Sequence, residues 1–333
     1  MKLLIVGGTR FVGRHLVNAA LARGDSVTLF NRGVSGAAPA GVAQRRGDRS
    51  SDLNELASGE WDAVIDTCGY LPGDVARMAQ RLAGRVGCYA FISSISVYAS
   101  AATPNREDST LAVIDDVDTT TVDGRTYGPL KALCEAQVQR SFGSAALILR
   151  PGLIVGPHDP TQRFTYWPAR LGRARDGDTV LAPGTPDAPV QFIDARDLAA
   201  FALHCLDAGT RGVFNVTSEP GRCTLGDVLA ECAAAAGVSV RFEWCDIAAL
   251  QAQGMEPWSD LPLAVPTTED AMMRTDSSQA IAAGLAARPL AHTVADTLAW
   301  YRSLPAEQQG FDKAGLSSER EAAALLAMKS RQT

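Results

Sequence analysis

The feature that most constrains this chain is a glycine-rich turn close to its start. The apolar run Lys2–Val6 predicts a buried β-strand, and Phe11–Ala22 carries apolar residues at helical spacing. Gly7, Gly8 and Gly13 lie in or beside the short stretch between them. Glycines at this place permit a tight turn and a close approach of backbone to a pyrophosphate, which would rest at the helix N-terminus. The segment therefore predicts a strand, turn and helix that hold an anion.

The first half of the chain continues to alternate short apolar runs with helical stretches. Strands that are apolar throughout suit a sheet covered by helices on both faces. The pattern predicts an α/β fold with a doubly wound parallel sheet. The predicted strands are Ser26–Asn31, Ala63–Thr67, Cys88–Ser93 and Ala146–Arg150, a further strand ends just before Arg46, and Tyr127–Ser141 is a helix.

Beyond Pro151 the composition changes, because Gly and Pro are frequent as far as Pro189. This change predicts an excursion into a smaller α/β substrate lobe over the carboxyl edge of the sheet. The strand Val190–Ile193, the helix Asp197–Leu206 and the strand Gly212–Thr217 are predicted to rejoin the sheet, and Ser239–Glu243 is a strand of the lobe. The predicted domains are 1–155 with 188–220 for the sheet, 156–187 with 221–310 for the lobe, and 311–333 for a C-terminal helical tail containing Ser317–Lys329.

Composition restricts the kinds of partner. The net charge of −6 gives no basic surface for nucleic acid or for an anionic membrane, so a small-molecule partner is expected. No apolar run approaches the roughly 18 residues that span a bilayer. The apolar start Met1–Gly8 leads directly into the glycine turn and is not interpreted as a signal peptide. These features predict a cytoplasmic protein that does not enter a membrane.

The cysteines and histidines predict neither disulfides nor a metal. Seven cysteines are scattered without a CxxC pair, and an odd number is a poor disulfide framework. A reducing compartment fits this usage. The four histidines have no metal-ligand spacing among themselves or with the cysteines.

A second group of polar residues follows the predicted strand Cys88–Ser93. Ser93, Ser94 and Ser96 stand at its end, and the later pair Tyr127 and Lys131 shares one face of a helix. The YxxxK spacing alone is common, and an amphipathic helix with a buried Tyr and a solvated Lys would produce it too. The spacing becomes significant here because the pair follows the glycine turn and the serine-containing strand in the chain. A phenol, an ammonium and a hydroxyl suit proton transfer at an alcohol or carbonyl group.

These segments resemble the extended, or atypical extended-like, short-chain dehydrogenases/reductases, the NAD-dependent epimerase/dehydratase family. In the family's GxxGxxG turn, Gly7 and Gly13 match the outer glycines and Arg10 replaces the middle one. The resemblance extends over nearly the whole chain and implies a Rossmann fold and an NAD(P)-dependent oxidoreductase. Further matching segments are Arg150–Pro157, Val190–Asp197 and Val213–Thr217.

The resemblance implies a role for each catalytic residue. Tyr127 passes a proton to or from the substrate oxygen, and Ser94 donates a hydrogen bond to that oxygen. Ser93 and Ser96 are the alternatives to Ser94. Lys131 holds the nicotinamide ribose, and its charge is expected to lower the pKa of the Tyr127 phenol.

The residues after the second strand favour NADP over NAD. An NAD enzyme usually has an acid there for the ribose 2′-hydroxyl, whereas this chain has Asn31 and Arg32, which can pair with a 2′-phosphate. Arg10 either lies beside the phosphates or turns to solvent. Asp48 resembles the family's adenine-contacting aspartate, although a turn or N-cap role explains it nearly as well. The predicted cofactor contacts are Gly7, Thr9, Arg10, Phe11, Val12, Gly13, Asn31, Arg32, Asp48, Thr67, Lys131 and Pro151.

Three features bear on the reaction. Ile95-Ser96 stand where 4,6-dehydratases carry an acidic pair, and Leu153 stands where many sugar-nucleotide enzymes carry an Asn. An NADP-type pocket also suits a cofactor that is consumed and exchanged. We therefore expect a reductase of a small carbonyl compound, or an alcohol dehydrogenase, with a nucleotide-sugar epimerase as the alternative.

A non-enzymatic alternative stays open. Arg10 in the turn and the segment Asp66–Tyr70 resemble a group related to chloroplast RNA-binding proteins of this fold. The acidic net charge and the complete Ser94, Tyr127 and Lys131 set argue against a nucleic-acid binder.

Substrate contacts are predicted in the loop after Pro157. These candidates are Ser96, His158, Arg163, Tyr166 and Trp167, and packing or a surface salt bridge is the alternative for the last three. Met255, Trp258 and Met272 either line the apolar side of the pocket or fill the core of the lobe. The resemblance also allows a homodimer formed through the helix that carries Tyr127.

Overall fold

Seven parallel strands form the central sheet, as the strand pattern predicted. The computed structural model describes residues 1–329. The order β11-β6-β5-β4-β1-β2-β3 changes direction at β1, so the turn that follows β1 lies at the topological switch point, where ligands of such sheets bind. The strands are β1 (Lys2–Val6), β2 (Ser26–Asn31), β3 (Ala43–Arg46), β4 (Ala63–Asp66), β5 (Tyr89–Ile92), β6 (Ala146–Pro151) and β11 (Gly212–Val216).

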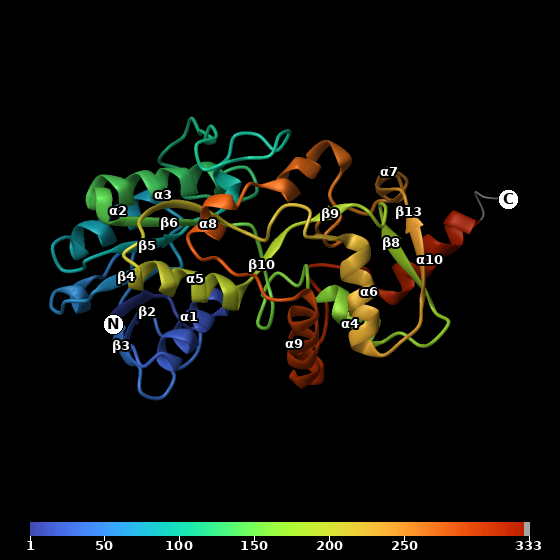
Figure 1. Ribbon diagram of the computed structural model, residues 1–333, viewed down its shortest axis with the longest axis horizontal. Helices are drawn as coiled ribbons and strands as arrows, with labels where there is room; N and C mark the ends of the chain where they lie inside the picture. The colour runs from blue at the N-terminus through green and yellow to red at the C-terminus, as the bar shows by residue number, and fades with distance from the viewer. Residues whose placement is uncertain (330–333) are drawn as a thin grey trace. The chain divides into compact units, whose positions relative to one another are not determined.

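Helices cover both faces of this sheet (Figure 1). On one face α1 (Phe11–Ala22) packs against α5 (Ala195–Asp207), and on the other α2 (Pro72–Leu82) packs against α3 (Tyr127–Phe142). Every residue of β4 and β5 is buried, and apart from Asp66 at the end of β4 these strands consist of apolar and aromatic residues. The same part of the chain as the central sheet also contains α8 (Ser278–Ala282) and the 3₁₀ turns η1 (Asn54–Leu56), η2 (Ile95–Val97) and η3 (Gly143–Ala145).

The chain divides into two compact units. The first comprises Met1–Leu153, Ala195–Glu219 and Thr275–Ala287, and the second comprises Ile154–Asp194, Pro220–Arg274 and the chain from Arg288 onward. The division differs from the predicted one at 275–287, where Asn215 Nδ2 of β11 donates to Asp276 O at 3.0 Å. It differs also at the predicted tail, because Leu316 and Ala324 lie in the core of the second unit. Residues 330–333 of that tail lie outside the described residues.

The second unit contains short strands and several helices. The strands are β7 (Leu153–Val155, at the border between the units), β8 (Thr179–Pro183), β9 (Pro189–Val190), β10 (Phe192–Asp194), β12 (Cys223–Thr224) and β13 (Arg241–Cys245). The helices are α4 (Tyr166–Gly172), α6 (Leu225–Ala236), α7 (Ile247–Gln251), α9 (Leu290–Ser303) and α10 (Ser318–Lys329), with the 3₁₀ segments η4 (Thr267–Arg274) and η5 (Ala306–Gln308).

One predicted strand was assigned to the wrong sheet. Val190–Ile193 was expected in the central sheet, but this stretch forms part of β9 and β10 in the second unit. Its hydrogen bonds explain the difference, because β9 pairs with β12 and β10 pairs with β7. The lobe strand expected at Ser239–Glu243 lies two residues later, as β13.

Two further observations concern membranes and metals. Within residues 1–329, no helix has both the length and the apolar character that crossing a membrane requires. In the same part of the chain, His, Cys, Asp and Glu side chains do not gather in groups of three that could hold a metal ion.

Candidate active site

The glycine turn after β1 has the form that a bound pyrophosphate requires. Gly7 has φ +100°, and a Cβ added there would come within 2.6 Å of Thr67 Oγ1. A Cβ at Gly13 would come within 2.7 Å of Gly8 N. Helix α1 begins directly after the turn with neither a side-chain cap nor an acid in its first turn. Its first N–H groups and its dipole therefore suit an anion, so the residues present fit a dinucleotide.

Side chains from neighbouring loops hold this turn in place. Asn31 Nδ2 donates to Gly7 O at 2.8 Å, and Asn31 Oδ1 accepts from Gly33 N at 2.9 Å and Gln44 Nε2 at 2.8 Å. The Asn31 amide is thus engaged by protein groups and positions the turn. Thr67 Oγ1 likewise donates to the backbone carbonyl that precedes Gly7, at 2.8 Å.

The structure also places four other predicted cofactor contacts. Thr9 Oγ1 lies 2.9 Å from Ser35 Oγ. Phe11 and Val12 are half-buried at the start of α1. Pro151 is buried at the end of β6.

Three exposed arginines lie on the turns at the ends of β1, β2 and β3. Arg10 stands at the N-cap of α1, and Arg32 directly follows β2. Arg46 ends β3, where it pairs with Asn31, and its Nε would lie 3.1 Å from a Cβ on Gly33. Arg46 was not among the predicted contacts, because only the pairing of β2 with β3 brings it to the turn that carries Arg32.

Asp48 closes a turn. Its Oδ1 accepts from Ser50 N at 2.9 Å and from Ser50 Oγ at 2.6 Å. These bonds lower the pKa of Asp48, with smaller contributions from the charges of Arg32 and Arg49. The structure thus provides the turn role that the sequence left open beside an adenine contact.

Ser94 and Tyr127 meet at the end of β5. Ser94 Oγ caps η2 by accepting from Ser96 N at 3.1 Å, and it lies 3.1 Å from Ser96 Oγ. Tyr127 is the first residue of α3. Burial raises the pKa of Tyr127, and a hydrogen bond with Ser94 opposes that rise. The phenol therefore carries its proton at neutral pH.

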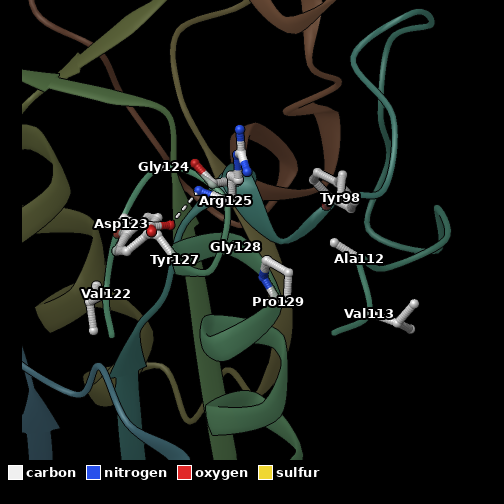
Figure 2. Close-up of a pocket in the computed structure, with 11 residues that line it drawn as sticks. Tyr98, Ala112, Val113, Val122, Asp123, Gly124, Arg125, Tyr127, Gly128 and Pro129 are labelled. Carbon is white, nitrogen blue, oxygen red and sulfur yellow. Dashed lines mark hydrogen bonds between the residues drawn. The ribbon is translucent and has the colours of Figure 1, made fainter. Parts of the chain in front are cut away.

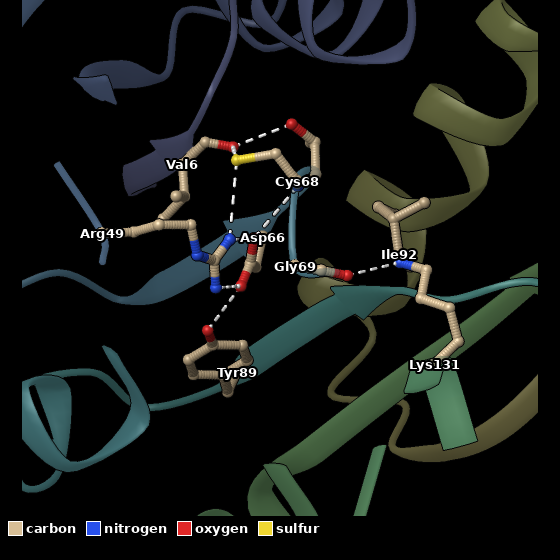
Figure 3. A network of polar contacts seen from close by, with 9 residues as sticks. Val6, Arg49, Asp66, Cys68, Gly69, Tyr89, Ile92 and Lys131 are labelled. Carbon is tan, nitrogen blue, oxygen red and sulfur yellow. Dashed lines mark hydrogen bonds and ion pairs between the residues drawn. The ribbon is translucent and has the colours of Figure 1, made fainter. Parts of the chain in front are cut away.

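Lys131 lies one helical turn after Tyr127 and is buried. Its Nζ donates to Gly69 O at 2.9 Å and to Ile92 O at 2.6 Å (Figure 3). It also stands 4.5 Å from the centre of the Phe91 ring. Burial lowers the pKa of Lys131 to about 8. The lowering of the Tyr127 pKa expected from Lys131 together with a bound nicotinamide stays a prediction, and in this structure burial raises that pKa.

The start of α3 packs tightly against η2. Asp123 Oδ1 accepts from Arg125 N at 2.8 Å and Thr126 N at 3.0 Å, which fixes the helix N-terminus. A Cβ on Gly128 would overlap the carbonyl oxygen of Ser96. Glycine at this position therefore sets the short distance between the helix that bears the phenol and the turn that follows Ser94.

A buried ion pair ties the same region to β6. Arg150 Nε and Nη2 donate to the Glu135 carboxylate of α3 at 2.9 and 2.7 Å, while Nη1 donates to Tyr98 Oη at 3.0 Å. Arg150 thus connects the Tyr127 helix with the segment that leaves η2.

Comparison with known proteins agrees with this arrangement. Residues 71–217 match the model described as the NAD dependent epimerase/dehydratase family. This part of the chain is similar to an epimerase/dehydratase domain of that family. The matched stretch of the epimerase/dehydratase domain contains Ser94, Tyr127 and Lys131, whereas the glycine turn precedes it.

Two curated relatives share part of the sequence. A sterol demethylase protein B from Methylococcus capsulatus is 29% identical over 256 residues, covering 69% of this chain and 73% of the relative. The chloroplast stem-loop binding protein of 41 kDa b from Arabidopsis thaliana is 26% identical over 257 residues, covering 71% of this chain. The chain spans 63% of that second relative, less than two thirds of its length.

A solved structure shares the fold of this chain. UDP-glucuronic acid 4-epimerase from Bacillus cereus, in complex with NAD, superposes with a TM-score of 0.66 at 15% identity. The superposition covers 94% of this chain and all of the epimerase chain. At this level of identity the likeness establishes the fold alone.

A cavity of about 670 Å³ opens beside Tyr127 (Figure 2). Ser96, which was a predicted substrate contact, is exposed and lines it together with Tyr127. The remaining lining residues are Tyr98, Ala112, Val113, Val122, Asp123, Gly124, Arg125, Gly128 and Pro129. All of them belong to the first unit.

The other predicted substrate contacts lie in the second unit. Tyr166 and Trp167 are 3% and 2% exposed, and Trp167 Nε1 donates to Pro262 O at 2.8 Å, so both side chains serve packing. Arg163 is exposed, with its guanidinium 5.6 Å from the centre of the Trp258 ring. The His158 ring lies 5.2 Å from that of Trp300.

The sequence pattern missed one residue near the phenol. The Tyr70 ring lies 6.4 Å from the Tyr127 ring and 5.3 Å from Lys131 Nζ. Tyr70 stands in the loop after β4, and this place beyond the carboxyl end of a central strand was the signal that could have found it.

Proposed function

We propose that this protein is an NADP(H)-dependent oxidoreductase that interconverts a carbonyl group and an alcohol on a small molecule. The observation that carries the proposal is the meeting of Ser94 with Tyr127 at the end of β5. Lys131 lies one helical turn away, and the glycine turn belongs to the same unit. A bound nicotinamide would supply or accept the hydride.

The protein's own groups handle the proton and the orientation of the substrate. Tyr127 carries a proton at neutral pH because burial raises its pKa, which suits it to protonate a carbonyl oxygen during reduction. Ser94 Oγ donates to the same oxygen and fixes its direction. Lys131 is held by two backbone carbonyls at the end of the sheet, where its ammonium can meet ribose hydroxyls.

The preference for NADP rests on two arginines. Arg32 and Arg46 are exposed on neighbouring turns, next to the Gly33 segment. Guanidinium groups pair well with phosphate, and the usual acid for a 2′-hydroxyl is replaced by Asn31. Asp48 lies close enough to Arg32 to feel its charge, but Arg32 and Arg46 together still leave the site one positive charge in excess.

Cofactor titration tests the proposal first. Purified protein is titrated with NADPH and with NADH by fluorescence or calorimetry, together with Arg32→Ala, and ketones and aldehydes are then screened for NADPH consumption with Tyr127→Phe. We expect tighter binding of NADPH, weakened by Arg32→Ala, and turnover that Tyr127→Phe abolishes. Preference for NADH would overturn the 2′-phosphate argument.

A nucleotide-sugar epimerase is the second candidate. The fold shared with UDP-glucuronic acid 4-epimerase supports it. An epimerase regenerates its cofactor in each cycle, so UDP-glucose would convert to UDP-galactose without net consumption of NADPH or NADH. Chromatography of the two sugar nucleotides separates this candidate from a reductase.

A nucleic-acid binder is the third candidate. The relative named for stem-loop binding supports it. The net charge of −6 opposes it, because phosphate backbones attract basic surfaces. Binding of an RNA hairpin at physiological salt, together with a failure to bind either dinucleotide, would favour it over the oxidoreductase.

The relative named as a sterol demethylase protein supports the oxidoreductase and suggests the character of the substrate. A sterol is a neutral alicyclic alcohol. We extend to this chain only that general class, an alcohol or ketone without a charged carrier group.

A further inference from the structure

The cavity beside Tyr127 carries apolar side chains that face solvent. Val113 is 89% exposed and Val122 is 43% exposed, and both line the cavity. In the view of Figure 2 they lie on either side of the start of α3. Exposed valines gathered at one cavity lose contact with water only when something apolar covers them. Ala112 and Pro129 add to the same lining.

The segment 99–126, which connects η2 to α3, is also strongly acidic. It contains the acids Glu107, Asp108, Asp115, Asp116, Asp118 and Asp123 against the bases Arg106 and Arg125. Within the cavity lining, Asp123 and Arg125 balance one another. Arg106 lies 3.6 Å from Asp276, so it offers little charge to a ligand. With six acids against two bases, the segment that contributes Val113 and Val122 to the cavity carries four more negative than positive side chains.

We propose that this cavity takes a neutral, largely apolar alcohol or ketone, and that the acidic segment 99–126 selects against anionic substrates such as sugar nucleotides. The inference rests on the proposed oxidoreductase function and names its substrate class. The apolar side chains of Ala112, Val113, Val122 and Pro129 bind the body of the substrate, while Tyr127 and Ser96 provide polar groups in the same lining. A volume of about 670 Å³ accommodates a molecule of several fused or branched rings.

The size of the charge effect depends on salt. Charges on an exposed segment act over about 8 Å at physiological ionic strength and about 30 Å at 0.01 M. Repulsion of an anionic substrate should therefore be strong at low salt and weak at high salt. A neutral substrate should show no such dependence.

A matched pair of ketones provides the experiment. NADPH consumption is measured with 4-tert-butylcyclohexanone, which is neutral, and with 4-oxocyclohexanecarboxylate, which carries one negative charge on a ring of the same size. We expect kcat/KM to be at least about tenfold higher for the neutral ketone at low salt. The KM of the anionic ketone should fall with added salt and in Asp115→Asn/Asp116→Asn/Asp118→Asn. Preference for the anionic ketone at low salt, or conversion of UDP-glucose, overturns the inference.

Variants of the apolar residues that line the cavity provide a second, independent test of the inference. Val113→Asp and Val122→Asp should each raise KM for the neutral ketone about tenfold and change kcat less than about threefold. Ile281→Asp is the matched control, because Ile281 is 42% exposed in α8 of the same unit and is not part of the lining. The inference fails if the two cavity variants behave like this control.

Failure of the substrate class and failure of the proposed function give different results. If Tyr127→Phe abolishes turnover but the ketones and the valine variants show no preference, only the substrate class is wrong. If Tyr127→Phe retains full turnover, the proposed function is wrong. Calorimetry with NADPH-loaded protein compares binding of the two ketones without turnover, and failure to bind the neutral ketone also overturns the inference.

Discussion

Asp66 and Arg49 form a two-point ion pair inside the first unit. Both terminal nitrogens of the Arg49 guanidinium donate to the Asp66 carboxylate, at 2.8 and 2.9 Å, and Tyr89 Oη donates to the same carboxylate at 2.8 Å (Figure 3). Asp66 is completely buried at the end of β4. The pair joins the segment after β3 to the strand that leads into Thr67, which underlies the glycine turn.

We expect Asp66→Asn and Arg49→Leu each to lower the free energy of unfolding by about 3–5 kcal/mol, because each leaves a buried group without its partner. Urea denaturation measures the change. Arg77→Ala, which breaks an exposed pair with Asp74, is the control and should cost no more than about 1 kcal/mol. Equal losses of unfolding free energy in all three variants would show that burial of the Asp66–Arg49 pair does not increase its contribution to stability.

The same pair predicts sensitivity to acid. Burial alone would raise the pKa of Asp66, but Arg49 and its other hydrogen-bond donors outweigh this effect and hold the pKa below its usual value. Its stabilising contribution is therefore present at neutral pH and is lost as pH falls through the folded-state pKa. Wild type should lose more stability than Asp66→Asn between pH 5 and lower values, and parallel curves would contradict this.

Lys131 predicts a further gain in stability with rising pH, in the alkaline range. Its pKa is about 8 in the folded chain against an ordinary value of 10.5. Between these values the unfolded chain binds more protons, so rising pH stabilises the fold. Relative to Lys131→Met, wild type should gain about 3 kcal/mol from pH 7 to pH 10.5. Urea titrations of both proteins across this range measure it, and a constant difference would refute it.

Arg46 should contribute to the selection of NADPH. Its Nε lies at the Gly33 turn, next to the residue that follows β2. We expect Arg46→Ala to weaken NADPH binding about tenfold, which corresponds to about 1.4 kcal/mol, with less than a twofold effect on NADH. Calorimetric titration measures both. Arg140→Ala, an exposed site on α3, is the control, and equal weakening of NADPH and NADH by Arg46→Ala would oppose a role at the 2′-phosphate.

Gly128 should control the rate of the chemical step. Because a Cβ there would overlap Ser96 O, Gly128→Ala must separate α3 from η2 and move Tyr127 away from Ser94. A displacement of about 1 Å can cost about 100-fold in rate. We expect kcat to fall by about that factor while cofactor affinity stays within twofold. Gly73→Ala at the exposed start of α2 is the control, since a Cβ there meets only the end of Arg77, at 3.9 Å. An unchanged kcat in Gly128→Ala would mean that the helix accommodates the methyl group.

Local patterns in the sequence were sufficient for the main elements of the fold. The apolar runs of β1, β2 and β6 and the helical spacing of α1 and α3 placed these elements within a residue or two, because burial of an element imposes a period on its own residues. The glycines of the first turn could be predicted for the same reason, since they serve a backbone geometry within a few residues. Tyr127 and Lys131 share a helix face by their spacing alone.

Only the tertiary structure decided which groups from distant segments meet. The parallel pairing of β2 with β3 brings Arg46 to the turn of Arg32, and the ends of β4 and β5 give Lys131 its two carbonyl partners. The burial that raises the pKa of Tyr127, and the packing role of Tyr166, likewise depend on several elements at once. A periodic pattern reports which side of one element is buried, but not what lies against it. That information arises from the register and packing of strands and helices far apart in the chain.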